Sequence, residues 1–332
     1  MHCFEQAAIS SVEVVLIGRR PVEGTDMELS ALCLGTMTFG SPVREAEAIT
    51  LVHWSLDHGI NFIDTANMYE GYARYVGSPG GVAEAFLGKA LRGRRERVVL
   101  ATKVGMKIGP LDSDRGLAKA HIRREVERSL RRLGTDYIDL YYLHAPDLDT
   151  PVAESVQALD ALVAEGHIRY WGVSNFSASQ VRELLETCDA GGWRRPVAVQ
   201  PAYSLLKRDI ESELLPLCHA ERLAVVPYRV LEGGMLTGKY LRGGSVPVGS
   251  RLAEKPEWVA PFGDELAAQL VGLEVEARGL GRTLLGHALL SLLERPGVVS
   301  LIVGVTRQVQ LAEMVAVLLG SRPIEGGGTH AD

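Results

Sequence analysis

The sequence predicts a (β/α)₈ barrel, and two patterns along the chain support this fold class. Short apolar runs of strand length alternate with longer stretches of helical periodicity, which is typical of parallel βαβ units. Eight such units in 332 residues fit a closed barrel better than an open, doubly wound sheet. The glycine pattern that a dinucleotide-binding open sheet places after its first strand is also missing from "LCLGTMTFG" at residues 32–40.

The predicted elements follow one another along the whole chain. The strands are 32–37, 61–66, 98–105, 137–144, 170–175, 197–204, 224–230 and 300–305. Periodic apolar positions between them predict helices, among them 44–59, 121–134 and 151–166. Residues 11–31 are expected to form a hairpin that closes the bottom of the barrel. We expect a single domain over residues 1–332, with the barrel proper at about 30–320.

Composition excludes several classes of function. A net charge of −6 provides no basic patch for nucleic acid. The four cysteines are scattered without a CxxC pair, which indicates reduced thiols in a cytoplasmic protein. The first 15 residues lack the basic and apolar regions of a secretory signal, and no apolar run reaches the roughly 18 residues of a membrane span. We therefore expect neither nucleic acid nor membrane as a partner.

Polar residues stand at the carboxyl ends of the predicted strands. A single polar residue there is more often a hydrogen-bonded edge residue than a catalyst, but barrel enzymes build their active sites at this end. Neighbouring strands lie about 4.8 Å apart, so three of these side chains on consecutive strands are expected to converge. Those three are Asp64, Lys103 and His144, and the remainder are Thr36, Ser174, Asn175, Gln200 and Tyr228.

The convergent residues suit proton transfer to a carbonyl oxygen. Asp64 is expected to hold Lys103, and the lysine cation to lower the pKa of the Tyr69 phenol from about 10. His144 then offers a second hydrogen bond to the substrate oxygen. Acyl transfer is disfavoured because no serine or cysteine nucleophile stands among them. Metal-dependent hydrolysis needs more histidine and carboxylate ligands, and Lys103 would repel a cation, so no metal is expected.

The order of these motifs resembles the aldo-keto reductase family, in particular its channel β-subunit and bacterial sugar-aldehyde reductase branch. Matching segments are "NFIDTANMY", "ATKVG", "SLRRLGTDYIDLYYLHAPD", "GVSNFS", "GGMLTGKY" and "IVGVTRQVQ". The resemblance implies a barrel that binds NADPH and reduces an aldehyde or ketone, such as a sugar or another small polar carbonyl. It implies a catalytic tetrad of Asp64, Tyr69, Lys103 and His144, with Tyr69 as the proton donor.

The resemblance also implies the NADPH contacts. Ser174, Asn175 and Gln200 would hold the nicotinamide carboxamide, and Tyr203, or alternatively Tyr228, would stack on its ring. Arg251 would reach the 2′-phosphate, which favours NADPH over NADH because the arginine fork suits phosphate. The remaining implied contacts are Thr36, Met37 and Asp64, the pyrophosphate loop with Arg229, Val230, Leu231, Gly233 and Lys239, and the adenosine end with Gly304, Thr306, Arg307 and Gln310. The chain departs from the family at "YRVL", where Arg229 replaces a serine, and at Met314, which replaces an asparagine near the adenine.

Two segments, 67–82 and 239–263, are longer than ordinary loops. The first follows Tyr69, and we expect it to form a wall of the substrate pocket, where Tyr72, Arg74 and Tyr75 offer contacts to a sugar or a phosphorylated aldehyde. The alternative is a solvated loop without a role. For the whole chain, the alternative function is an NADPH-binding regulatory subunit with little turnover and a membrane partner.

Overall fold

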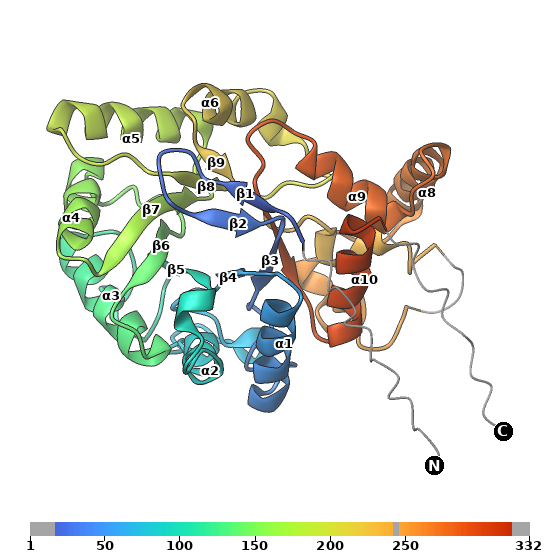
Figure 1. Cartoon of the computed structure of the whole chain (residues 1–332), viewed down its shortest axis with the longest axis horizontal. Helices are drawn as coiled ribbons and strands as arrows, with labels where there is room; N and C mark the ends of the chain where they lie inside the picture. Colours follow the sequence, from blue (N-terminus) through green and yellow to red (C-terminus); the bar gives the residue numbers. More distant parts are fainter. Residues whose placement is uncertain (1–16, 242–245, 321–332) are drawn as a thin grey trace, which may run out of the picture.

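The computed structural model describes residues 17–241 and 246–320, and a curled sheet of eight parallel strands forms its centre (Figure 1). The strand order is β10-β3-β4-β5-β6-β7-β8-β9, so strands that follow one another in the chain are also neighbours in the sheet. Each strand overlaps one predicted strand. They are β3 (Leu32–Gly35), β4 (Phe62–Asp64), β5 (Val99–Val104), β6 (Ile138–Leu143), β7 (Ile168–Ser174), β8 (Ala198–Gln200), β9 (Ala224–Val225) and β10 (Leu301–Gly304).

Backbone hydrogen bonds on both sides of β10 close the sheet. On one side, β10 pairs with β3 in parallel. On the other side, Val299 N donates to Val225 O at 3.0 Å, and Ile302 N donates to Pro227 O at 2.9 Å. The first and last strands of the series therefore meet, and the predicted (β/α)₈ barrel is confirmed.

Helices surround the strands (Figure 1). The outer ring contains α1 (Glu45–Asp57), α2 (Val82–Ala90), α3 (Lys119–Leu133), α4 (Val152–Ala164), α5 (Ala178–Gly191), α6 (Leu214–Ala220), α9 (Leu284–Leu293) and α10 (Gln308–Leu318). Two further helices, α7 (Arg251–Glu254) and α8 (Asp264–Gly279), precede α9. Short 3₁₀ turns are η1 (Gly71–Ala73), η2 (Arg95–Arg97), η3 (Asp209–Glu211), η4 (Glu232–Thr237) and η5 (Pro256–Trp258). The predicted helices 44–59, 121–134 and 151–166 correspond to α1, α3 and α4.

Side chains alternate along the strands between the barrel interior and the helices. In β4, Ile63 packs outward into the cluster between sheet and helices, while Phe62 packs inside the barrel. The interior cluster also contains Cys33, Ala101 and Tyr142. Side chains two positions apart on a strand point to the same side. A residue that follows an interior residue by two positions, at the carboxyl end of its strand, therefore points into the barrel mouth.

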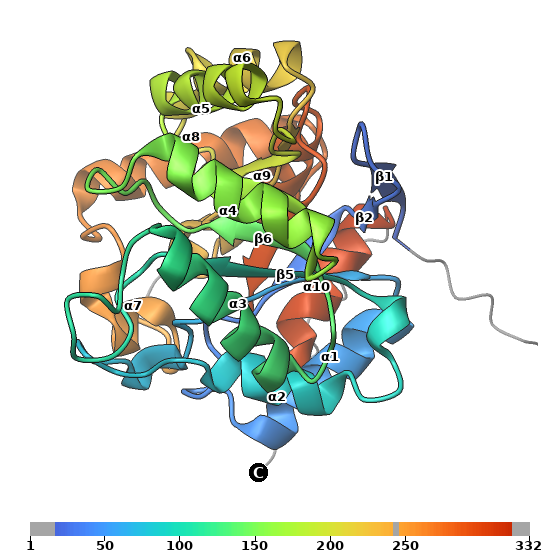
Figure 2. The same ribbon diagram turned by 90° about the vertical axis from the view of Figure 1, so that its left-hand side faces the viewer.

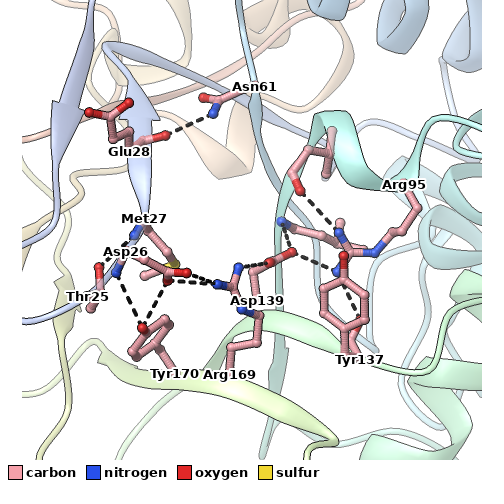
Figure 3. A network of polar contacts seen from close by, with 12 residues as sticks. Thr25, Asp26, Met27, Glu28, Asn61, Arg95, Tyr137, Asp139, Arg169 and Tyr170 are labelled. Carbon is pink, nitrogen blue, oxygen red and sulfur yellow. Dashed lines mark hydrogen bonds and ion pairs between the residues drawn. The ribbon is translucent and has the colours of Figure 1, made fainter.

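The predicted hairpin closes the opposite end of the barrel (Figure 2). It consists of β1 (Arg19–Pro21) paired antiparallel with β2 (Glu28–Ser30), and residues 11–16 lie outside the described range. A polar network fastens it to the strands around a cavity of about 600 Å³ (Figure 3). Buried Asp139 accepts hydrogen bonds from Arg95 at 2.7 Å, Arg169 at 2.8 Å and the Leu100 amide at 2.9 Å. Arg169 also forms an ion pair with Asp26 of the hairpin.

Two predicted strands are shortened more than the others. The ranges 197–204 and 224–230 reduce to β8 and β9, and in each case a proline, Pro201 or Pro227, follows soon after the strand. Proline lacks the amide hydrogen that continues a ladder. Beyond Pro227 a single bridge joins Tyr228 to Ala202. Of the helices described, none is long and apolar enough to cross a membrane.

Candidate active site

The polar residues at the strand ends continue the inward series of the barrel. Asp64 stands two residues after the interior residue Phe62, and Lys103 two after Ala101. His144 and Gln200 follow Tyr142 and Ala198 by the same interval. Strand pairing places Gly35 beside Asp64 and Lys103 beside Tyr142. The carboxyl ends of neighbouring strands therefore lie at similar heights around the barrel. The period of two thus brings the predicted residues to one small volume.

Lys103 lies at the centre of this volume and is fully buried. Its ammonium forms an ion pair with Asp64 and donates to the Thr65 carbonyl at 2.8 Å. It also donates to the Tyr69 hydroxyl at 3.3 Å. The three donors of the ammonium are therefore all used, and one of them contacts the phenol.

Tyr69 lies on the loop after β4, with its ring against His144. The two rings meet edge to face, with centroids 5.8 Å apart and an interplanar angle of 79°. The Tyr69 amide donates to the Ala66 carbonyl at 3.0 Å, which turns the chain back over the mouth. The prediction that Asp64, Tyr69, Lys103 and His144 converge agrees with these contacts.

Burial and charge act against each other in the buried pair. Burial alone would lower the Lys103 pKa, but the Asp64 carboxylate and Tyr69 outweigh it, so the pKa lies above its usual value. The Asp64 pKa is raised by burial, against the opposing effects of Lys103 and a hydrogen bond from Gln200. Lys103 remains a cation at neutral pH.

The Tyr69 pKa differs from the sequence expectation. Burial raises this pKa above its usual value and outweighs the lowering effect of Lys103, so the expected lowering is wrong. Desolvation opposes the charged phenolate, and the loss of water is the larger effect at this buried position. Tyr69 is therefore protonated at neutral pH, as a proton donor must be.

His144 is held in its neutral form. Burial, with further contributions from Lys103 and Arg74, lowers its pKa well below the usual value. The ring nitrogen Nδ1 is buried without a hydrogen-bond partner among the described residues. A neutral imidazole carries one N–H donor and one acceptor nitrogen.

Three predicted carboxamide-binding residues form a chain of hydrogen bonds with the tetrad. Gln200 donates from Nε2 to Asp64 at 2.9 Å, across the barrel interior. Ser174 donates to the Gln200 carbonyl at 2.9 Å, and the Asn175 amide donates to the His144 carbonyl at 2.8 Å. Asn175 has a φ of +64°, an uncommon conformation for a residue other than glycine. The contact of Gln200 with Asp64 was not predicted.

The two candidates for ring stacking lie in different surroundings. Tyr203 is buried, and its hydroxyl donates to Glu211 at 2.5 Å. Tyr228 is half-buried at the mouth, and its hydroxyl donates to Asn175 at 2.6 Å. Tyr228 follows the interior residue Val226 by two positions and therefore faces the same volume as the tetrad.

Two predicted cofactor cations flank the glycine turn of η4. Gly233 and Gly234 have φ values of +65° and +97°. The Lys239 ammonium lies beside Gly234, where an added Cβ would come within 2.7 Å of Nζ, and the Arg251 stem passes over Gly233. Within the described residues, neither cation forms an ion pair, whereas Arg229 pairs with Glu232 at 2.9 Å. Two cations beside the half-buried backbone of this turn fit a phosphate group.

The remaining predicted contacts divide between the start of α10 and the ends of the strands. The Gln310 side-chain oxygen accepts from the Thr306 amide at 2.9 Å and from the Arg307 amide at 3.1 Å. Gly304 and Arg307 are exposed, whereas Thr36 and Val230 are buried, and Met37 and Leu231 are half-buried. The Thr36 hydroxyl donates to the backbone carbonyl of Asp64 at 3.0 Å, so it helps to fix the backbone that carries this tetrad residue.

Arg74 is a further residue that acts on the site from the 67–82 segment. It donates to the Met68 carbonyl at 2.7 Å and also bonds the Lys107 carbonyl, so it braces the loop that carries Tyr69. The sequence indicated Arg74 only as a substrate contact. Among the described residues, no group of three or more His, Cys, Asp or Glu is arranged to hold a metal ion. The site can donate two hydrogen bonds to one oxygen atom and stabilise the phenolate that remains.

Comparison with known proteins agrees with this geometry. Residues 31–322 match the sequence model of the Aldo/keto reductase family. An Arabidopsis thaliana protein named probable voltage-gated potassium channel subunit beta is 35% identical over 295 residues, covering 86% of this chain and 87% of its own length. The uncharacterized oxidoreductase YrpG of Bacillus subtilis is 39% identical over 256 residues, covering 75% of this chain and 74% of its own.

Solved structures show the same similarity. The glycerol dehydrogenase AKR11B4 from Gluconobacter oxydans superimposes with a TM-score of 0.74 at 30% identity, covering 90% of this chain and 89% of that one. The aldo-keto reductase AKR11C1 from Bacillus halodurans superimposes with a TM-score of 0.73 at 29% identity, covering 93% of this chain and 92% of that one. The match of the family model over most of the chain, together with these relatives, shows that this chain belongs to the aldo/keto reductase family.

Proposed function

We propose that this chain is a cytoplasmic, single-domain reductase that uses NADPH to convert an aldehyde or ketone into the alcohol. The observation that carries the proposal is the buried Lys103, which joins Asp64 to the Tyr69 hydroxyl beside a neutral His144. The expected substrate is a small polar carbonyl, such as a sugar.

In this mechanism, two donors bind the carbonyl oxygen. The Tyr69 hydroxyl and an N–H of His144 orient the substrate and polarise its C=O bond. A bound nicotinamide supplies the hydride to the carbonyl carbon. Tyr69 gives its proton to the oxygen, and the charge that develops on Oη lies 3.3 Å from the Lys103 ammonium. Asp64 holds that ammonium in place.

The residues around the mouth fit NADPH. Lys239 and Arg251 have no ion-pair partner among the described residues and suit the phosphates, and Asn175, Ser174 and Gln200 offer polar groups for the carboxamide. Between the two stacking candidates, its place at the mouth favours Tyr228 over the buried Tyr203. Gly304, Thr306, Arg307 and Gln310 would border the adenosine.

The test replaces Tyr69 by phenylalanine. We expect kcat for NADPH-dependent reduction to fall by about 10²- to 10⁴-fold, the usual contribution of a general acid. NADPH binding, followed by fluorescence, should remain. Tyr170→Phe is the matched control, because it removes a phenol hydrogen bond at the opposite end of the barrel. Unchanged turnover in Tyr69→Phe would refute the proposal.

A second candidate is a regulatory subunit that binds NADPH with little turnover. The observation that favours it is the 35% identity to a probable voltage-gated potassium channel subunit beta. Turnover with a panel of aldehydes, ketones and keto-sugars separates the two candidates. Tight NADPH binding with no oxidation by any carbonyl, together with capture of a membrane partner, would favour the regulatory subunit.

A further inference from the structure

Two aromatic rings from separate segments hold the guanidinium of Arg251. Its central carbon lies 4.9 Å from the ring centroid of Tyr72 and 5.7 Å from that of Trp258. The two rings meet edge to face at 5.4 Å. Tyr72 belongs to the 67–82 segment, whereas Trp258 belongs to η5, just after α7 at the mouth end of the barrel (Figure 2). The cluster thus joins the loop after Tyr69 to the segment that carries Arg251.

The backbone holds Tyr72 in a defined position. Its amide donates to the Ser41 carbonyl at 2.7 Å. Gly71 has a φ of +73°, and an added Cβ would lie 2.1 Å from that same carbonyl, so only glycine fits this approach. Arg74 fastens the far side of the turn to the Met68 carbonyl at 2.7 Å. The phenol is therefore presented by a braced turn.

The backbone of Arg251 is also fixed in position. It is the first residue of α7, whose cap Ser250 accepts a hydrogen bond from the Ala253 amide at 3.3 Å. Its stem passes over Gly233, where an added Cβ would be 3.5 Å from Cγ. No carboxylate of the described residues forms an ion pair with it, and its buried Nε has no hydrogen-bond partner there.

This arrangement leaves the positive charge available for a ligand. A carboxylate partner would neutralise the guanidinium and occupy its planar fork, whereas an aromatic face holds the cation without accepting its in-plane N–H groups. The Tyr72 hydroxyl also lies within hydrogen-bonding reach of Arg251, but without a carboxylate partner among the described residues the guanidinium keeps further N–H donors for an anion.

We propose that Tyr72 and Trp258 are positioning residues that aim Arg251 at the 2′-phosphate of NADPH. The segment expected to border the substrate therefore also takes part in choosing the cofactor. This inference rests on the proposed function, in which Arg251 contacts that phosphate. Two cation–π contacts predict an effect of about five- to thirty-fold on the affinity for the phosphorylated cofactor alone.

The experiment measures dissociation constants of the full chain for NADPH and for NADH by fluorescence titration. We expect Tyr72→Ala and Trp258→Ala to raise the constant for NADPH about ten-fold and to leave that for NADH within two-fold. Tyr72→Phe keeps the ring and loses only the hydroxyl contact to Arg251, so it should keep most of the affinity for NADPH and leave that for NADH unchanged. Val76→Ala is the control, because Val76 is exposed on the same loop and does not belong to the Arg251 cluster.

Each contrary result identifies what failed. If Tyr72→Ala weakens both nucleotides equally, the ring supports the loop in general and the inference is overturned. An unchanged NADPH constant in both alanine variants overturns it as well. If wild type binds the two nucleotides equally, the NADPH preference itself is wrong and the inference falls with it. If it binds neither, the proposed function fails first.

Discussion

Removing one charge of the Asp64–Lys103 pair should destabilise the protein far more than removing both. The two charged groups are almost completely buried. At an effective dielectric constant of about 20, charges 4 Å apart attract by about 4 kcal/mol, and these two are closer. Breaking such a pair typically costs about 3–5 kcal/mol, because it leaves a buried charge uncompensated.

The remaining partners differ between the two single variants. Lys103→Met leaves Asp64 with the Gln200 amide as its side-chain donor, at 2.9 Å. Asp64→Asn leaves the ammonium with the Thr65 carbonyl at 2.8 Å and the Tyr69 hydroxyl at 3.3 Å. We therefore expect each single variant to lower the free energy of unfolding by about 3–5 kcal/mol, and the double variant Asp64→Asn/Lys103→Met to change it little.

Urea denaturation followed by circular dichroism measures these free energies, and the double-mutant cycle gives the coupling. A coupling above about 2 kcal/mol is expected, while all three variants lose reductase activity. If the losses in unfolding free energy of the two single variants simply add in the double variant, the reasoning is refuted, since additivity means that the two charges do not compensate each other. A stable but inactive double variant would show that the pair is retained for chemistry rather than for folding.

Three further predictions concern the bottom of the barrel, His144 and the Tyr72 turn. Asp139→Ala should lower the free energy of unfolding by about 3–5 kcal/mol, since Arg95 and Arg169 lose their buried partner. Because the folded state lowers the His144 pKa, the unfolded chain binds more protons, so stability should fall as pH drops below about 6.5. His144→Gln should weaken this dependence in denaturation at pH 7 and pH 5. Gly71→Ala should lower the melting temperature more than Gly93→Ala in thermal denaturation. Both glycines have positive φ, but only at Gly71 would an added Cβ meet another segment of backbone. Equal losses in melting temperature would contradict the close-contact argument.

The fold was predictable because its signals are local. A strand buried on both faces requires a continuous apolar run, and eight such runs with intervening helices permit few architectures. The strand ends were less predictable. Pro201 and Pro227 stop two strands that apolar composition would have extended.

The candidate site was predictable by residue type and position. Asp64, Lys103 and His144 stand at equivalent ends of consecutive strands, so register alone brings them together. The hydrogen bond from Gln200 to Asp64 crosses the barrel interior between residues 136 positions apart. The contact of Tyr72 with Arg251 was equally hidden, because the resemblance assigned the arginine to a phosphate and the loop to the substrate.

The direction of the Tyr69 pKa shift shows what only three-dimensional structure supplies. The sequence indicates a neighbouring cation, which by itself lowers a phenol pKa. Burial acts in the opposite direction, and its size depends on how completely the loop covers the ring. The same desolvation drives His144 to its neutral form, because burial disfavours whichever state is charged. One physical cause therefore keeps the proton on the phenol and removes it from the imidazolium, which leaves two neutral side chains that can each donate a hydrogen bond.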